Sequence, residues 1–173
     1  IAVDDQRSQE AIDIIERLHG RGARHIVSLR TGLRAYEQAE RWDDVLRTLR
    51  LVEKRDALHP AAVRRLRDKA YGELVAGKAG DPAALRELWR SLRADERAQP
   101  ELASQTAAAL ADTGADDDAR RIVEQALDAG FAEALPAVYA RVGGLALRDR
   151  LERLEGWRSR YGDEPALLLA LGR

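Results

Sequence analysis

The stretch PELASQTAAALADTGADDDARRIVEQALDAG, residues 100–130, decides the fold of this chain. Both halves repeat apolar residues at helical spacing, and Gly114 marks a turn between them. Two helices joined by so short a turn run antiparallel, so the stretch predicts a helical hairpin. In the second helix Ala119, Val123 and Ala126 are four and three places apart and share one face.

The same spacing of apolar residues recurs in three further segments: Ala11, Ile15 and Leu18; Val45, Leu49 and Val52; and Leu85, Trp89 and Leu92. The matching turn positions Gln6, Glu40, Gly80 and Gly114 lie 34, 40 and 34 residues apart. A looser step of about 28 residues places Leu147, Leu151 and Leu154 after Val142 and Gly143. The pattern resembles tetratricopeptide repeats, in which about 34 residues form one hairpin.

Composition supports helices throughout, because Ala, Leu, Arg and Glu dominate and lose little side-chain freedom in a helix. We expect no strands. The periodicity predicts helices at residues 6–19, 23–39, 41–56, 60–77, 81–94, 99–113, 115–129, 132–142, 146–160 and from 164 onward. Pro136 must lie in the first turn of its helix or bend it.

The predicted fold class is all-α, a tetratricopeptide-like right-handed superhelix of antiparallel hairpins that forms a single segment, 1–173. Its expected units are 1–20 (a second helix only), 23–57, 60–95, 99–130, 132–161 and 164–173 (the start of a further repeat). The closing EPALLLALGR reads as the beginning of a first helix. We therefore expect a piece of a longer stack whose exposed terminal faces could self-associate.

Charge and composition exclude several classes of protein. A net charge of −1 gives no reason to expect nucleic-acid binding, and the absence of Cys excludes disulfides and thiolate sites. No apolar run reaches the length of about 18 residues that a membrane-spanning helix needs. Residues 1–97 carry 20 Lys and Arg against 17 Asp and Glu, and residues 98–173 carry 9 against 13. An acidic partner would be drawn to the first half.

Five stretches carry a closer resemblance: ARHIVSLR (23–30), RWDDVLRTLRLVEKRDAL (41–58), ELWRSL (87–92), AVYARV (137–142) and LEGWRSRYGDEPALLLALGR (154–173). Together they resemble the HemY family, tetratricopeptide proteins of Gram-negative bacteria linked to protohaem synthesis. The resemblance implies a soluble repeat region of a protein that is anchored in the inner membrane by segments outside this chain. The family has no established catalytic residues, so none is carried over.

Four arginines are the candidate partner-binding residues. Arg30 and Arg34 lie four apart on one predicted helix, and Arg64 and Arg67 lie three apart on another, so each pair shares a face. If both pairs face the groove of the stack, their guanidinium groups would capture carboxylates of a peptide or propionates of a porphyrin. The alternative is a solvated face with pairs inside one helix, such as Arg34 with Glu37.

These observations predict a non-catalytic scaffold that holds a protein or peptide partner, which the resemblance places among haem-biosynthetic proteins. The alternative is a porphyrin or haem-precursor carrier, and less readily an enzyme of that pathway. No Ser/His/Asp or Cys/His set is indicated. We assign no catalytic residue, no cofactor or cofactor-binding residue, and no metal ligand.

Some conspicuous residues have a structural explanation. His19 and His59 fit a helix end and a turn before a proline, and neither they nor His25 are expected to bind haem. HGRGARH (19–25) and GKAG (77–80) lack the preceding strand of a phosphate loop, so they predict turns.

Acidic residues that precede helices are predicted N-caps: Asp81, Asp116 and Asp163, with Asp117 and Asp118 in the first turn. Trp89 is predicted to lie in the core, since an aromatic residue at that position packs between helices. Trp42 lies beside a turn, and the sequence is compatible with two interpretations: a core position or a role in bracing the hairpin.

Overall fold

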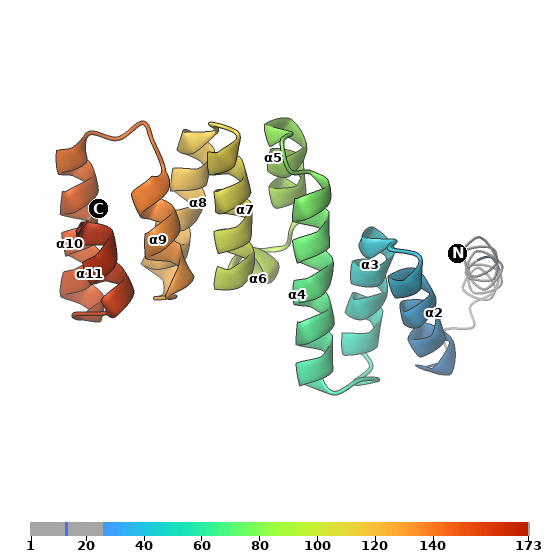
Figure 1. Ribbon diagram of the computed structural model, residues 1–173. Helices are drawn as coiled ribbons and strands as arrows, with labels where there is room; N and C mark the ends of the chain where they lie inside the picture. The colour runs from blue at the N-terminus through green and yellow to red at the C-terminus, as the bar shows by residue number, and fades with distance from the viewer. Residues whose placement is uncertain (1–12, 14–25, 173) are drawn as a thin grey trace. The chain divides into compact units, whose positions relative to one another are not determined.

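The computed structural model describes Asp13 and residues 26–172, and this part of the chain forms helices and no strand (Figure 1). The predicted all-α class is confirmed for these residues, whereas the predicted helix 6–19, with Ala11, Ile15 and Leu18, lies outside them. None of the described helices is long and apolar enough to cross a membrane. In chain order they are α2 (Ile26–Gln38), α3 (Trp42–Glu53), α4 (Pro60–Gly77), α5 (Pro82–Ser91), α6 (Ala94–Arg97), α7 (Pro100–Asp112), α8 (Asp116–Ala129), α9 (Ala134–Arg141), α10 (Leu147–Tyr161) and α11 (Pro165–Leu171).

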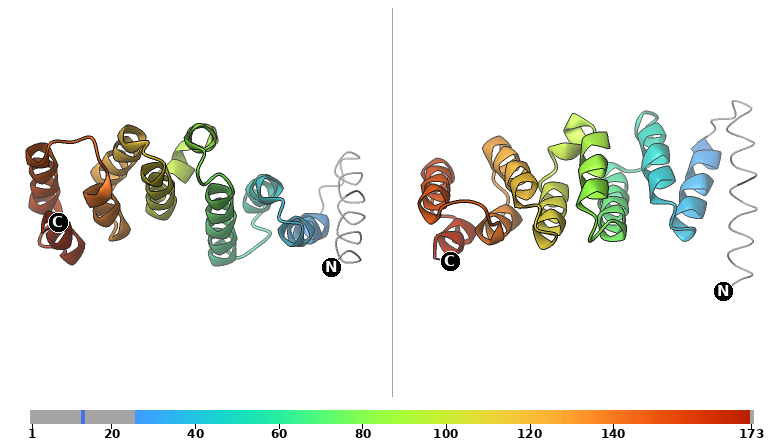
Figure 2. Two further views of the ribbon diagram at one scale, coloured as in Figure 1. Left: turned by 45° about the horizontal axis from the view of Figure 1, so that its top comes forward. Right: turned by 90° about the horizontal axis from the view of Figure 1, so that it is seen from above.

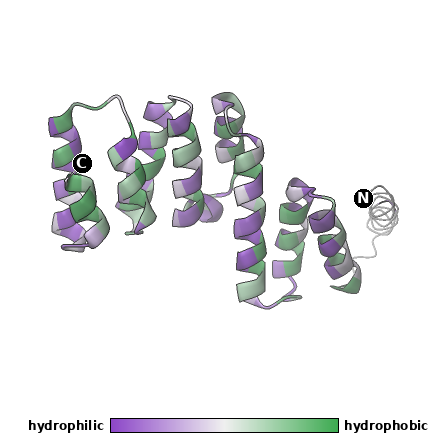
Figure 3. Cartoon of the chain, in the orientation of Figure 1, coloured by the Kyte–Doolittle hydropathy of each residue, from purple (hydrophilic) through white to green (hydrophobic). Residues whose placement is uncertain are grey.

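The chain divides into two compact units, Ile1–Leu74 and Val75–Arg173, and the division falls inside α4. In the first unit α2 packs against α3. In the second, α7 packs against α8 and α9, α9 against α11, and α11 against α10, as the neighbouring helices in Figures 1 and 2 show. Hydrophobic and hydrophilic bands alternate around the helices (Figure 3), so each helix has an apolar face that its neighbours cover.

The turn between α7 and α8 forms at Gly114, as predicted. Gly114 has a positive φ of 74°, a conformation that glycine adopts without strain. The amide of Ala115 donates to the carbonyl of Leu110 at 3.0 Å, and the hydroxyl of Thr113 donates to the same carbonyl at 2.7 Å. These bonds satisfy carbonyls that the end of α7 would leave unpaired and close the predicted hairpin.

Two other predicted turn positions adopt the same left-handed backbone, with φ of 54° at Glu40 and 89° at Gly80. Directly after Gly80, Asp81 Oδ1 accepts the amides of Ala83 and Ala84 at 2.9 and 3.0 Å. The N-cap role predicted for Asp81 is therefore confirmed. The three predicted turn positions, Glu40, Gly80 and Gly114, each lie just after the end of a helix. GKAG lies in the same connection, as a turn between α4 and α5.

Most of the predicted core positions on the second helices are buried. Val45, Leu49 and Val52 of α3, Leu85 of α5, and Ala119 and Val123 of α8 are all fully buried. Four described positions of the pattern are not buried, and one of them is the half-buried Leu151 of α10. Trp89 and Ala126 are only half-buried because the next positions around the helix, Leu88 and Leu127, take the core places, and Leu147 is 65% exposed at the start of α10.

Two of the predicted caps are wrong. Ala115 is the N-cap residue of α8, so Asp116 opens the first turn, where the helix dipole favours a negative charge. Glu164 is the N-cap residue of α11 and makes no side-chain cap bond. Asp163 accepts a bond from Arg158 Nε at 2.6 Å instead, and this bond lowers the pKa of the Asp163 carboxyl.

The helix predicted at 81–94 ends earlier than expected, and an extra short helix follows it. Leu92 and Arg93 are extended, with ψ of 144° and 162°. The buried carboxylate of Glu96 accepts the amide of Arg93 at 2.9 Å, which starts α6 at Ala94. Elsewhere the bounds follow the prediction closely: α4 begins and ends as predicted, and Pro136 lies in the first turn of α9.

Directional contacts hold α10 in place within the second unit. Trp157 is 4% exposed, its ring meets Tyr139 edge-on at a centroid distance of 4.9 Å, and its Nε1 donates to Asp128 Oδ1 at 2.9 Å. Arg150 donates to two backbone carbonyls at the end of α9, at 3.0 and 2.6 Å. The indole thus combines packing against α9 with a polar tether to α8.

Replacing Trp157 should separate these two contributions. Trp157→Phe keeps an aromatic ring and removes the donor to the exposed Asp128, so we expect a loss of about 1 kcal/mol in the free energy of unfolding. Trp157→Ala also empties the buried position and should cost about 3–5 kcal/mol. Urea denaturation followed by circular dichroism measures both. An alanine variant within about 1 kcal/mol of the original would contradict a buried role for this ring.

Candidate functional site

A hollow of about 430 Å³ lies in the first unit between α2 and α4, and we call it the α2–α4 hollow. Its apolar part includes Leu33, which is 4% exposed, and three half-buried residues, Leu58, Ala62 and Leu66. Four cationic side chains and one carboxylate complete the lining: Arg30, Arg34, Arg65, Lys69 and Glu37. The hollow therefore combines an apolar surface with a local excess of positive charge.

Helical spacing explains why these residues meet. Arg30 and Arg34 are four apart on α2, and Arg65 and Lys69 are four apart on α4, so each pair projects from one face. The remaining predicted residues lie elsewhere. Arg67 is paired with Glu53 of α3 and its side chain is 11% exposed, while Arg64 is exposed and does not line the hollow.

The acidic residue of the hollow is already engaged. Lys69 Nζ donates to Glu37 Oε1 at 2.8 Å and lies 5.3 Å from the centre of the Trp42 ring. The bond from Glu37 raises the pKa of Lys69, and the negative charge of Glu37 acts in the same direction. Glu37 thus pairs across two helices, and in the part of the chain that the structure describes Arg34 forms no ion pair with it.

Three guanidinium groups of this hollow are available to a ligand. Arg30, Arg34 and Arg65 are exposed and make no side-chain hydrogen bond or ion pair within residues 26–172. Trp42, which the sequence left open, is half-buried and braces Lys69 beside the hollow. Sequence reasoning found Arg30 and Arg34, but it missed Arg65 and Lys69 because the rotation of α4 about its axis is set by packing.

A second hollow, of about 240 Å³, lies in the second unit, and we call it the α5–α8 hollow. It is lined by Arg86, Trp89 and Arg90 of α5, Arg97 of α6, Leu110 of α7, and Asp118, Arg121, Ile122 and Gln125 of α8. The sequence analysis did not identify it. The pair Arg86 and Arg90, four apart around Trp89, was the available signal, but its acidic partner lies 32 residues further along the chain.

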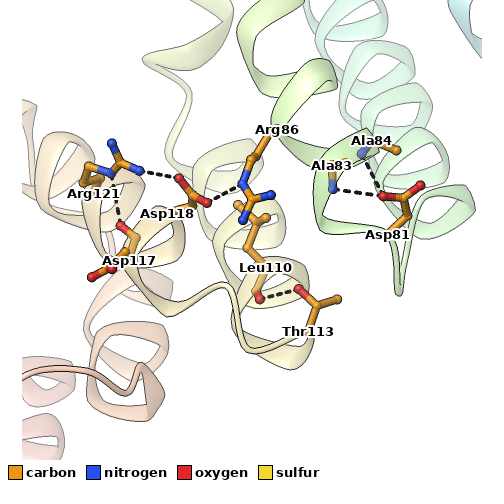
Figure 4. Close-up of polar contacts among 9 residues, drawn as sticks. All are labelled: Asp81, Ala83, Ala84, Arg86, Leu110, Thr113, Asp117, Asp118 and Arg121. Carbon is orange, nitrogen blue, oxygen red and sulfur yellow. Dashed lines mark hydrogen bonds and ion pairs between the residues drawn. The ribbon is translucent and has the colours of Figure 1, made fainter.

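Asp118 organises the second hollow (Figure 4). Arg86 Nε donates to Asp118 Oδ2 at 2.5 Å, and Arg121 donates to the other carboxylate oxygen. The bond from Arg86 lowers the pKa of Asp118 despite its partial burial. The neighbouring Asp117 pairs with Arg120 at 2.7 Å, so the acidic run at the start of α8 serves ion pairs as well as the helix dipole.

Other candidate groups are accounted for separately. His59 Nδ1 accepts the amide of Ala61 at 3.2 Å at the start of α4, which fits the predicted turn role. His19, His25 and the HGRGARH turn lie outside the described residues. Among the residues that the structure does describe, no group of three or more His, Asp or Glu is arranged to hold a metal ion.

Comparisons with known proteins add no family to this picture: no family model, no curated protein and no solved structure matches the chain. The two hollows and their unpaired arginines are consequently the features from which a function can be argued.

Asp118→Asn should reveal the contribution of the Arg86 bond to stability. Because folding lowers the pKa of Asp118, the contribution is present above the unfolded-state pKa of about 4 and disappears as the pH falls further. Arg86 is 38% exposed, so solvent screening limits the expected loss at pH 7 to about 0.5–1 kcal/mol.

Urea denaturation at pH 7 and pH 3 measures this difference. Asp117→Asn is the matched control, since the Asp117 side chain is 76% exposed and its loss should have little effect. Equal losses at both pH values would contradict an ionised Asp118–Arg86 pair.

Proposed function

We propose that this protein is a non-catalytic scaffold that binds an acidic segment of a partner protein at the α2–α4 hollow. The observation that carries the proposal is that Arg30, Arg34 and Arg65 pair with none of the residues 26–172 and lie around an apolar surface. Such a group of guanidinium ions is complementary to carboxylates.

A tetratricopeptide-like architecture is part of this proposal. Left-handed turns at Glu40, Gly80 and Gly114, 40 and 34 residues apart, support repeated hairpins of nearly constant length. The small residue Ala119, buried four places before Val123, supports the close helix packing that this repeat requires. In such a stack α2 and α4 would be consecutive first helices, and the hollow between them would belong to the ligand-binding surface.

The chemistry of the hollow favours a mixed acidic and apolar ligand. Guanidinium groups bind carboxylates through two parallel hydrogen bonds, and three of them require several acceptors. Leu33, Leu58 and Leu66 offer apolar area to a side chain between those acceptors. The volume of about 430 Å³ is that of a pocket for a few side chains rather than for a whole helix.

The resemblance to the HemY family supplies a biological setting for the proposal. It supports partners among haem-biosynthetic proteins and a tether to the bacterial inner membrane outside this chain. Self-association through exposed terminal repeats is an alternative to binding such a partner. A scaffold would also explain why no catalytic set emerges from the described residues.

Neutralising two of the arginines should abolish capture of an acidic probe. We expect Arg30→Gln with Arg34→Gln to weaken binding of a fluorescent peptide of alternating Glu and Leu at least tenfold, because two charge-assisted contacts are lost. Fluorescence polarisation measures the affinity. Rising salt should weaken binding to the original protein, because exposed charges are screened.

Arg55→Gln with Arg148→Gln is the matched control, since it removes the same charge at two exposed arginines that line neither hollow. Affinities that fall equally in both double variants would show that only net charge matters and would overturn the assignment. In the intact membrane-embedded protein, a photocrosslinking residue at Arg34 should label a partner that the same residue at Arg148 does not.

A porphyrin carrier is the second candidate, because the carboxylates of two propionates could also bind arginines beside an apolar surface. Among the described residues, no His lines the α2–α4 hollow to ligate haem iron. We therefore expect titration with haem or protoporphyrin to give no saturable Soret shift at micromolar ligand. If a saturable shift were observed and disappeared in the Arg30→Gln, Arg34→Gln variant, the carrier function would be supported and the scaffold function rejected.

A further inference from the structure

Hydrogen-bond donors outnumber acceptors in the α5–α8 hollow, where the side-chain amide of Gln125 is the acceptor that the described contacts leave free. Arg90 and Arg97 are exposed and make no side-chain bond within the described part of the chain, and the same holds for the indole N–H of Trp89. The carboxylate of Asp118 is occupied on both oxygens. A molecule that satisfies this surface must therefore be rich in acceptors and negatively charged.

Asp118 also fixes two of the donors in position. Arg86 uses its Nε for Asp118, and no recorded hydrogen bond engages its two terminal nitrogens. Arg121 is held from the other side by Asp118 and by the backbone carbonyl of Asp117 at 3.2 Å, as Figure 4 shows. Held guanidinium groups lose less conformational freedom when they bind an anion, which strengthens the site.

The geometry points to a binding site for a phosphomonoester dianion in the α5–α8 hollow, with Arg90 and Arg97 as its principal contacts. This site is separate from the α2–α4 hollow, and the inference does not depend on the proposed scaffold function. Trp89, half-buried on the wall, would contact the group that carries the phosphate.

Charge and size favour phosphate over a carboxylate. Four arginines against the single carboxylate of Asp118 leave a local excess of three positive charges, which one carboxylate cannot balance. A phosphomonoester carries a charge of about −2 near neutral pH and three strong acceptor oxygens. The hollow of about 240 Å³ holds a phosphate with a side chain or a small organic group, and the half-buried ring of Trp89 provides apolar contact for that group.

Phenyl phosphate and benzoate test the inference, because they share a ring and differ in the anion. We expect phenyl phosphate to bind the full chain with a Kd of about 1 mM or tighter, and benzoate about tenfold more weakly. Nuclear magnetic resonance of the nitrogen-15-labelled protein reports binding. The indole signal of Trp89, identified by its loss in Trp89→Phe, should shift with phenyl phosphate.

Two double variants of equal charge locate the site. Arg90→Gln with Arg97→Gln should weaken phenyl phosphate binding by about tenfold or more, whereas Arg55→Gln with Arg148→Gln, at two arginines that line neither hollow, should change it less than about twofold. All four arginines are exposed, so folding should persist, and Arg97→Gln alone serves if the double variant unfolds. Its expected loss is about threefold or more.

Several results would overturn the site. These are the absence of saturable binding up to about 10 mM phenyl phosphate, equal weakening in both double variants, and equal affinity for benzoate and phenyl phosphate. Two further probes identify the source of the ligand: a phosphoserine peptide and inorganic phosphate. Tighter binding of the peptide assigns a phosphorylated protein segment, and equal binding of the two assigns a small phosphate compound.

Discussion

Helix-to-helix packing is the constraint on which the structure depends. Helices as short as α9, with 8 residues, or α3, with 12, are marginal alone in water, because nucleation costs entropy that few hydrogen bonds offset. Each helix persists because a neighbour covers its apolar face. Short turns enforce that pairing, and the left-handed residues at Glu40, Gly80 and Gly114 let the chain reverse without an unpaired carbonyl.

The need to pack constrains the charged residues as well. Many arginines are used to join one element to another: Arg67 reaches Glu53, Arg86 reaches Asp118, and Arg150 reaches the end of α9. Within residues 26–172, five arginines that line the two hollows have no such partner: Arg30, Arg34, Arg65, Arg90 and Arg97. Exposed ion pairs contribute little to stability, so the fold loses little by leaving these groups open to the binding proposed above.

The candidate site was only partly accessible from the sequence. The four-residue spacing of Arg30 and Arg34 placed them together, and both line the α2–α4 hollow. On α4 the spacing alone did not determine which residues face α2. In the packed structure Arg65 lines the α2–α4 hollow, whereas Arg67 pairs with Glu53 of α3. The α5–α8 hollow could not be predicted, because its residues come from four helices and no local pattern links them.

The sequence by itself determined the described helices other than α6 and the three turns that reverse the chain. It also identified the buried residues Val45, Leu49 and Val52 of α3 and Ala119 and Val123 of α8. These features depend on local spacing and on the glycine or cap residues present. Only the tertiary structure decided that Trp89 borders a hollow, that α6 starts at the carboxylate of Glu96, and that Asp163 binds Arg158 rather than capping α11. The physical reason is that these outcomes depend on the rotation and spacing of packed helices, which arise from contacts between residues far apart in the chain.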